Sequence, residues 1–278
     1  MKVLFILLML TQAYALAQLK IKKVLVEGEG LPIVMLAGGT ADMSVFAVPA
    51  IELSSQHKVI RMEHFNVQYA SDGLLLPNNY SVRMESEAIK YTLDSLAIKE
   101  PIVLVGHSYG GVIALDFALR YPTRIRSLVL IEPPVFSIAE AKNESPKGMK
   151  EMQDLLAKLT PHADITEDHV ERFRCALMNC DSSSIRQLPQ WTMWVVQKNR
   201  MRGLSVVNGF NLDLKKLHAF QKPVLMITGT RTAEFHKRIN KLLTMEFTNA
   251  KEVSIQSGHA IPSTAPKELV KSLQEFIK

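Results

Sequence analysis

The sequence predicts an α/β protein with a mostly parallel central sheet and helices on both of its faces. Short apolar runs rich in Val, Ile and Leu, typical of buried strands, alternate along the chain with longer segments of helical periodicity. Between residues 134 and 220 the strand-like runs disappear and only helical patterns remain. The 278 residues, of which 47% are hydrophobic, are enough for one sizeable domain with a subdomain.

The first 17 residues have the pattern of a secretory signal peptide. Lys2 gives a positive start, residues 3–10 are all apolar, and residues 15–17 (ALA) fit the small-x-small cleavage rule. The apolar run is too short to cross a bilayer, so no stable membrane anchor is expected. We expect a mature chain from Gln18 onwards, exported to a bacterial periplasm or to the medium.

We expect a small-molecule substrate and no nucleic-acid partner. The net charge is +6, but the basic residues are scattered, which favours a solvated basic surface over a nucleic-acid site. No group of His, Asp, Glu and Cys has metal-ligand spacing, so no metal or cofactor is expected.

The two cysteines, Cys175 and Cys180, are five positions apart. They could form a disulfide if a helix ends between them, or they could both be buried free thiols. The sequence gives no oligomeric state.

The first half of the predicted sheet begins with an edge strand over residues 19–27, which alternates apolar and polar side chains. A wholly apolar strand over 32–37 follows and ends in Gly38-Gly39-Thr40. Helices are expected over 45–54 and 81–98, on either side of a strand at 58–62. His64, a lone histidine in the loop after that strand, is expected to be structural or on the surface.

The chain is organised around residues 106–111, which read GHSYGG. The apolar run 101–105 before them predicts a buried strand, and residues 112–121 space their apolar side chains as a helix does. Ser108 therefore lies at a strand-to-helix turn, where the flanking glycines permit a tight, strained backbone that pushes the hydroxyl outward.

Three further strands follow the turn, and two of them lead directly to a titratable side chain. The strand over 125–131 ends at Glu132, and the strand over 251–256 is followed by Ser257-Gly258-His259 and a closing helix over 264–276. Between them, the strand over 223–228 leads into a loop with no aspartate, in which Glu234 is the nearest carboxylate.

The turn at Ser108 resembles the nucleophile elbow of the alpha/beta-hydrolase family, which places a serine, an acid and a histidine in that chain order. The resemblance implies that Ser108 is the nucleophile and His259 the base. It also implies an oxyanion hole, for which the N–H groups of Gly39 and Tyr109 are the candidates. The acid usually follows the strand after the cap, where this chain has none. We therefore expect Glu132 to be the acid, as in members that place it one strand earlier, and keep Glu234 as the alternative.

The same resemblance identifies residues 134–220 as a helical cap inserted after the sixth strand, with residues 18–133 and 221–278 forming the core. Apolar stripes are expected around 149–159, 170–177 and 185–196. A cap also faces the substrate, so Phe173, Trp191 and Trp194 are candidate pocket residues that would form an apolar wall.

These residues predict a serine hydrolase that cleaves a small, apolar ester through an acyl-serine intermediate. The same groups could act on lactones, amides or carbon–carbon bonds, or as a cofactor-free perhydrolase. A non-catalytic ligand-binding protein with a hydrolase fold is the alternative from another class, and the missing aspartate keeps it open.

Overall fold

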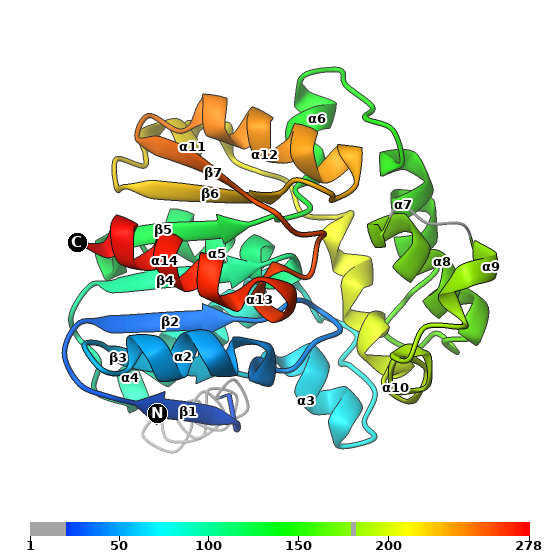
Figure 1. Ribbon diagram of the computed structural model, residues 1–278, viewed down its shortest axis with the longest axis horizontal. Helices are drawn as coiled ribbons and strands as arrows, with labels where there is room; N and C mark the ends of the chain where they lie inside the picture. The colour runs from blue at the N-terminus through cyan, green and yellow to red at the C-terminus, as the bar shows by residue number, and fades with distance from the viewer. Residues whose placement is uncertain (1–20, 179–181) are drawn as a thin grey trace, which may run out of the picture.

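A computed structural model describes residues 21–178 and 182–278, which contain seven strands in one sheet (Figure 1). The strand order is β1-β3-β2-β4-β5-β6-β7, with β1 antiparallel to β3 and the other neighbours parallel. The expected mostly parallel sheet is confirmed. The strands are β1 (Val24–Glu27), β2 (Pro32–Leu36), β3 (Lys58–Met62), β4 (Ile102–His107), β5 (Ile125–Ile131), β6 (Val224–Gly229) and β7 (Ala250–Ile255).

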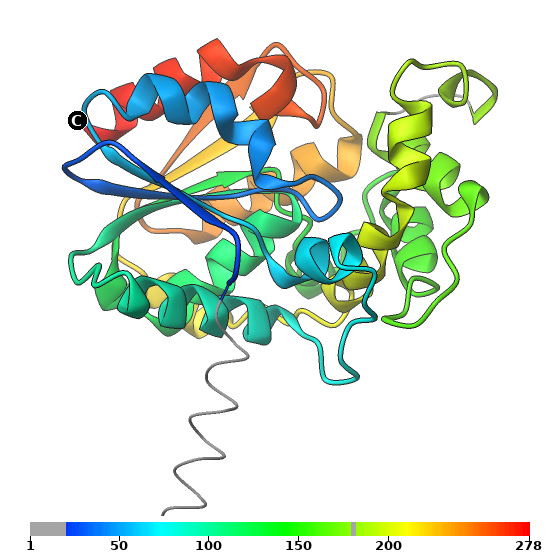
Figure 2. The ribbon, with the colours of Figure 1, turned by 90° about the horizontal axis from the view of Figure 1, so that it is seen from below.

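Helices cover both faces of the sheet (Figure 2), because alternate residues of each central strand point to opposite sides. In β2, Val34 and Leu36 join the core under α4 (Val82–Ser95), α5 (Tyr109–Arg120) and α12 (Glu234–Glu246). Ile33 and Met35 join the opposite core, under α2 and α14. The other helices outside the segment between β5 and β6 are η1 (Met43–Phe46), α2 (Ala47–Leu53), α3 (Phe65–Ser71), η2 (Pro122–Arg124), α13 (Ile261–Thr264) and α14 (Pro266–Ile277).

In its described part, the segment between β5 and β6 contains helices joined by loops and no strand. Its first and last helices, α6 and α11, contact α12 beside the sheet, whereas α7 to α10 lie beyond the carboxyl ends of the strands (Figure 1). The helices are α6 (Phe136–Ala141), α7 (Met149–Leu156), α8 (Glu167–Met178), α9 (Ser182–Ile185), α10 (Trp191–Val196), η3 (Lys198–Val207) and α11 (Leu214–Ala219).

Two details of this segment differ from expectation. It follows β5, the fifth strand of the described sheet, and not a sixth strand. The stripe expected over 185–196 is divided between α9 and α10, with Pro189 between them, because a proline has no N–H to continue a helix.

Two expectations concern residues outside the described part of the chain. The signal peptide at residues 1–17 is one, and the pairing of Cys175 is the other, because its candidate partner Cys180 is not described. Within the described residues, no helix has the length and apolarity needed to cross a membrane.

Candidate active site

Ser108 lies between β4 and α5 with a strained backbone, at φ 52° and ψ −122°. This left-handed φ is unfavourable for a residue with a side chain and requires support from its surroundings. The neighbouring glycines allow backbone segments to pack closely around the turn. A Cβ on Gly106 would lie 2.3 Å from the Gly110 oxygen, and one on Gly110 would lie 2.3 Å from the Ala37 oxygen. Ser108 itself is partly exposed although its neighbours are buried.

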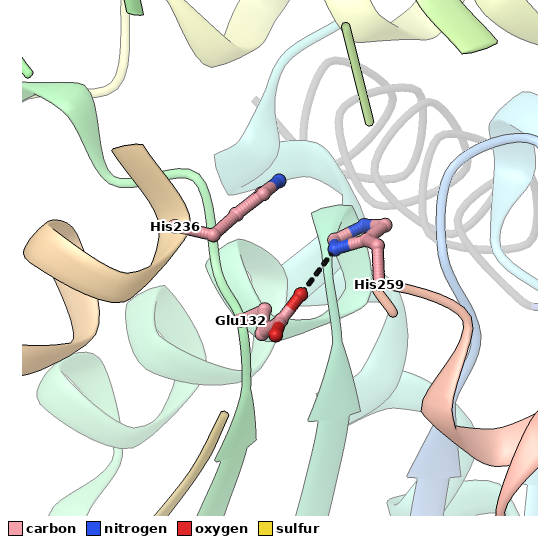
Figure 3. Close-up of side chains that lie close together, drawn as sticks. All are labelled: Glu132, His236 and His259. Atoms are coloured by element: carbon pink, nitrogen blue, oxygen red, sulfur yellow. Dashed lines mark hydrogen bonds and ion pairs between the residues drawn. The ribbon is translucent and has the colours of Figure 1, made fainter. Parts of the chain in front are cut away.

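Glu132 and His259 are hydrogen-bonded to each other (Figure 3), with Glu132 Oε2 2.5 Å from His259 Nδ1. Glu132 directly follows β5, is fully buried, and also has a positive φ, of 48°. Its carboxylate accepts two more hydrogen bonds, from the Gly229 N–H to Oε1 at 2.6 Å and from Thr232 Oγ1 to Oε2 at 2.8 Å. These three donors hold the buried carboxylate in one orientation.

The structure brings Glu132, and not Glu234, to the histidine. Glu234 begins α12 with its side chain 62% exposed, and it pairs with Lys237 at 2.8 Å. The sequence alone leaves both carboxylates open as the acid.

His107 fixes the position of the His259 loop relative to the elbow. Its Nε2 lies 2.8 Å from the His259 carbonyl oxygen, and the two ring centroids are 4.9 Å apart. Burial lowers the pKa of His107 to about 3, so the ring is neutral and donates its Nε2–H to that carbonyl. Because His107 directly precedes Ser108, this contact places the histidine loop against the turn at Ser108.

His236 is a second buried histidine beside His259, although the sequence around it favours a polar helix or loop. It is 1% exposed, and its ring stacks on that of His259 at a centroid distance of 4.2 Å and an angle of 20°. Neither ring nitrogen has a hydrogen-bond partner among the described residues, and burial holds the pKa of His236 well below its usual value. The sequence does contain a signal that His236 is buried, because it lies at helical spacing with Ile239, Asn240 and Leu243, which form the buried face of α12.

Glu132, His236 and His259 offer ligand atoms within 4.8 Å of one another (Figure 3). A metal ion would need the in-plane lone pairs of both imidazoles to converge on one point. The nearly parallel rings instead direct these lone pairs alongside each other. The arrangement fits an oriented histidine base better than a metal centre.

The Gly38-Gly39 loop lies against the elbow. A Cβ on Gly38 would be 3.4 Å from the Ser108 Cβ, and one on Gly39 would be 3.2 Å from the Tyr109 Cβ. Among the described residues, neither the Gly39 N–H nor the Tyr109 N–H donates a hydrogen bond to the protein. Two unpaired N–H groups on adjacent segments beside a serine are what an oxyanion hole requires.

Asn66 holds this loop to η3. Its Nδ2 donates to the Gly39 oxygen at 2.6 Å, and its Oδ1 accepts from the Gly203 N–H at 2.9 Å. Glu85, buried beneath, accepts from the Asn66 N–H at 3.1 Å, and burial raises the pKa of Glu85 to about 7. His64 is also buried, with Nε2 3.3 Å from the Gly38 oxygen, which agrees with a structural role.

The candidate pocket residues occupy different surroundings. Phe173 is buried on α8, and the half-buried Trp194 stacks at 4.6 Å on the guanidinium of Arg174. Trp191 lies 5.3 Å from the guanidinium of Arg186, which forms an ion pair with Glu171. Arg174 in turn donates a hydrogen bond from Nη2 to Thr40 Oγ1 at 3.0 Å, next to Gly39. Of the two tryptophans, Trp194 is therefore the one connected to the Gly38-Gly39 loop, through Arg174.

The family model of the alpha/beta hydrolase fold matches residues 32–266, and the chain belongs to this family. The sheet order, the turn at Ser108 and the loop carrying His259 agree with that membership.

Similar proteins include hydrolases and a decarboxylase. The cis-3-alkyl-4-alkyloxetan-2-one decarboxylase of Shewanella oneidensis is 30% identical over 42% of this chain and 36% of its own. The 2-hydroxy-6-oxo-2,4-heptadienoate hydrolase of Pseudomonas putida is 32% identical over 37% of this chain and 38% of its own. The matches therefore span well under half the length of these two relatives. The structure of a thermophilic esterase from Thermogutta terrifontis, described as malate-bound, has a TM-score of 0.72 at 18% identity and covers 92% of both chains.

Proposed function

We propose that the protein is a serine hydrolase that cleaves small esters through an acyl-serine intermediate. The observation that carries the proposal is the hydrogen bond from His259 to the buried Glu132, in a loop that His107 holds against Ser108. A serine in a strained turn beside a histidine with an oriented carboxylate is the arrangement used for acyl transfer. Ser108, His259 and Glu132 are the proposed nucleophile, base and acid.

In the first half of the proposed reaction, His259 acts as base. Its Nδ1–H donates to Glu132, so the Nε2 lone pair is free to take the proton from Ser108 Oγ. The oxygen attacks the ester carbonyl carbon, and the N–H groups of Gly39 and Tyr109 stabilise the resulting oxyanion. The protonated His259 then gives its proton to the departing alcohol, which leaves an acyl-serine.

In the second half, water replaces the alcohol. His259 takes a proton from a water molecule while the water oxygen attacks the acyl carbon, which gives a second tetrahedral intermediate. When this intermediate collapses, His259 returns the proton to Ser108 Oγ. The products are a carboxylic acid and the free enzyme. We propose that residues 134–220 act as the cap over this site and that Phe173 and Trp194 contribute apolar walls to the acyl pocket, with Trp191 farther out.

Labelling with a fluorophosphonate tests the proposal, because this reagent modifies only an activated serine rapidly. We expect modification of Ser108, located by mass spectrometry, that is lost in Ser108→Ala and slowed strongly in His259→Ala and Glu132→Gln. Glu234→Gln tests the other candidate acid and should keep the wild-type rate. An intact protein whose Ser108 does not react would favour the ligand-binding alternative. Rapid labelling that survives Glu132→Gln would remove Glu132 as the acid.

A further inference from the structure

Arg174 extends from α8 in the cap segment to the glycine loop of the core. Its Nη2 donates to Thr40 Oγ1 at 3.0 Å, and its guanidinium stacks 4.6 Å from the ring of Trp194. A guanidinium has five N–H donors, and this is the one hydrogen bond that Arg174 makes to the described residues. Its Nε is buried without a partner.

The charge of Arg174 is not balanced by any carboxylate of the described residues. Other arginines nearby do have acidic partners: Arg172 pairs with Asp168, and Arg186 pairs with Glu167 and Glu171. Burial lowers the pKa of Arg174 to about 10, so the side chain still carries its full charge at neutral pH. Arg174 is half-buried, and a partly desolvated cation without an anion among the described residues is unfavourable, which favours binding of an anionic ligand.

A second arginine, Arg200, lies at the same loop but has acidic partners. Arg200 Nη1 lies 3.4 Å from the Thr40 carbonyl oxygen and 3.3 Å from Asp42 Oδ2. Asp42 and the buried Glu63 are the two carboxylates that interact with Arg200. Arg174 forms no ion pair with either of them, so among the described residues its charge remains without a carboxylate partner beside Thr40.

This excess charge lies close to the proposed nucleophile. Gly38 touches the elbow, since a Cβ there would be 3.4 Å from the Ser108 Cβ. Thr40 follows only two residues later, and two residues span at most about 7 Å. A substrate whose ester group reaches Ser108 could therefore extend a second polar group to Arg174 without a long chain.

We propose that Arg174 binds a carboxylate of the substrate, so that the preferred esters are monoesters of short dicarboxylic acids. The inference rests on the proposed function, because it names the substrate class of that same site. A planar carboxylate matches the unused donors of the guanidinium, which can hold both oxygens. The rings of Trp194 and Phe173 provide apolar surroundings that strengthen such a pair.

The test compares two esters that differ only in charge: the 4-nitrophenyl monoester of glutaric acid and the methyl ester of that compound. We expect the wild type to prefer the anionic ester. Arg174→Gln should lower kcat/KM for it by about 10- to 100-fold, mainly through KM, the loss typical of a charged hydrogen bond. The neutral ester should change little. Equal losses on both esters, or an unchanged preference, would overturn the inference.

Two further variants separate charge from structure. Arg172→Gln removes the same charge from the outer side of the same helix, where the side chain is 49% exposed, and should leave the preference intact. Thr40→Val removes the hydrogen-bond acceptor of Arg174 and keeps its charge. If Thr40→Val abolishes the preference as Arg174→Gln does, the tether and not the cation sets the selectivity, and the inference fails.

Binding to the Ser108→Ala protein distinguishes failure of the inference from failure of the proposed function. Titration calorimetry with monomethyl glutarate should show binding that is weakened about 10- to 100-fold by adding Arg174→Gln and is unaffected by adding Arg172→Gln. Arg174-dependent binding without Ser108-dependent turnover would refute hydrolysis and retain the carboxylate site. If both esters are turned over in a Ser108-dependent way and Arg174→Gln changes neither rate, hydrolysis is retained and the carboxylate site is refuted.

Discussion

Replacing Glu132 by glutamine should lower kcat/KM by about ten-thousandfold, because the new side chain selects the wrong tautomer of His259. The Gly229 N–H donates to Oε1 at 2.6 Å, so the amide oxygen of the new side chain has to occupy that position. The amide nitrogen then lies where Oε2 accepted from His259 Nδ1 at 2.5 Å and donates to that ring nitrogen. The imidazole proton moves to Nε2, which can no longer take the proton of Ser108. A ten-thousandfold loss corresponds to about 5.4 kcal/mol of transition-state stabilisation.

The assay is turnover of 4-nitrophenyl acetate at pH 8, with the tautomer of His259 read from its ¹⁵N shifts. A carboxylate brought in from the next loop should restore part of the activity. Thr232 Oγ1 is 2.8 Å from Glu132 Oε2, so Thr232→Asp combined with Glu132→Ala should exceed Glu132→Ala alone by about tenfold or more. If Glu132→Gln kept more than about a tenth of wild-type kcat/KM, or kept the proton on Nδ1, the reasoning would be refuted.

Three more outcomes are expected. Gly229→Ala would place a Cβ 2.7 Å from the oxygens of Ser257 and Gly258, so it should displace the His259 loop and lower kcat/KM by about a hundredfold or more, with the fold retained by circular dichroism. His236→Phe removes a buried histidine whose lowered pKa makes the wild type lose stability as the pH falls below 6.5. Relative to wild type, the variant should therefore gain about 1.4 kcal/mol per pH unit on acidification from pH 6.5, measured by urea unfolding, and parallel pH profiles would contradict this. We propose that the protein is exported, so its mature form should begin at Gln18 by amino-terminal sequencing, and a retained Met1 would disprove the signal peptide.

The parts of the site that could be predicted from sequence are those encoded by adjacent residues. The elbow at Ser108 is one, because an apolar strand, two glycines and a helix follow one another directly, and the structure reproduces the strained turn. The loop at His259 is another, since it follows the last strand of the sheet. In both cases the position along the chain already determines the edge of the sheet at which the side chain lies.

The contacts that distinguish one candidate site residue from another join residues that are far apart in the chain. Glu132 is selected over Glu234 by its contacts with Gly229 and Thr232, which are 97 and 100 positions away, and no local pattern encodes them. Arg174 does not stand out in the sequence, because a charged residue on a helix is usually solvated. The role that we propose for it rests on its contact with Thr40, 134 positions earlier.

The position of Glu132, the proposed acid, explains why β6 ends in a glycine. Glu132 follows β5 and His259 follows β7, so the hydrogen bond between them passes over the end of β6, the strand between the two. A side chain at Gly229 would meet the backbone of the histidine loop at 2.7 Å and Glu132 Oε1 at 3.2 Å. The bare backbone there instead donates its N–H to the carboxylate. An acid placed directly after β6 would not need a residue without a side chain at position 229. We therefore expect a variant with its acid after β6 to tolerate a side chain at Gly229, whereas a protein that uses Glu132 should not.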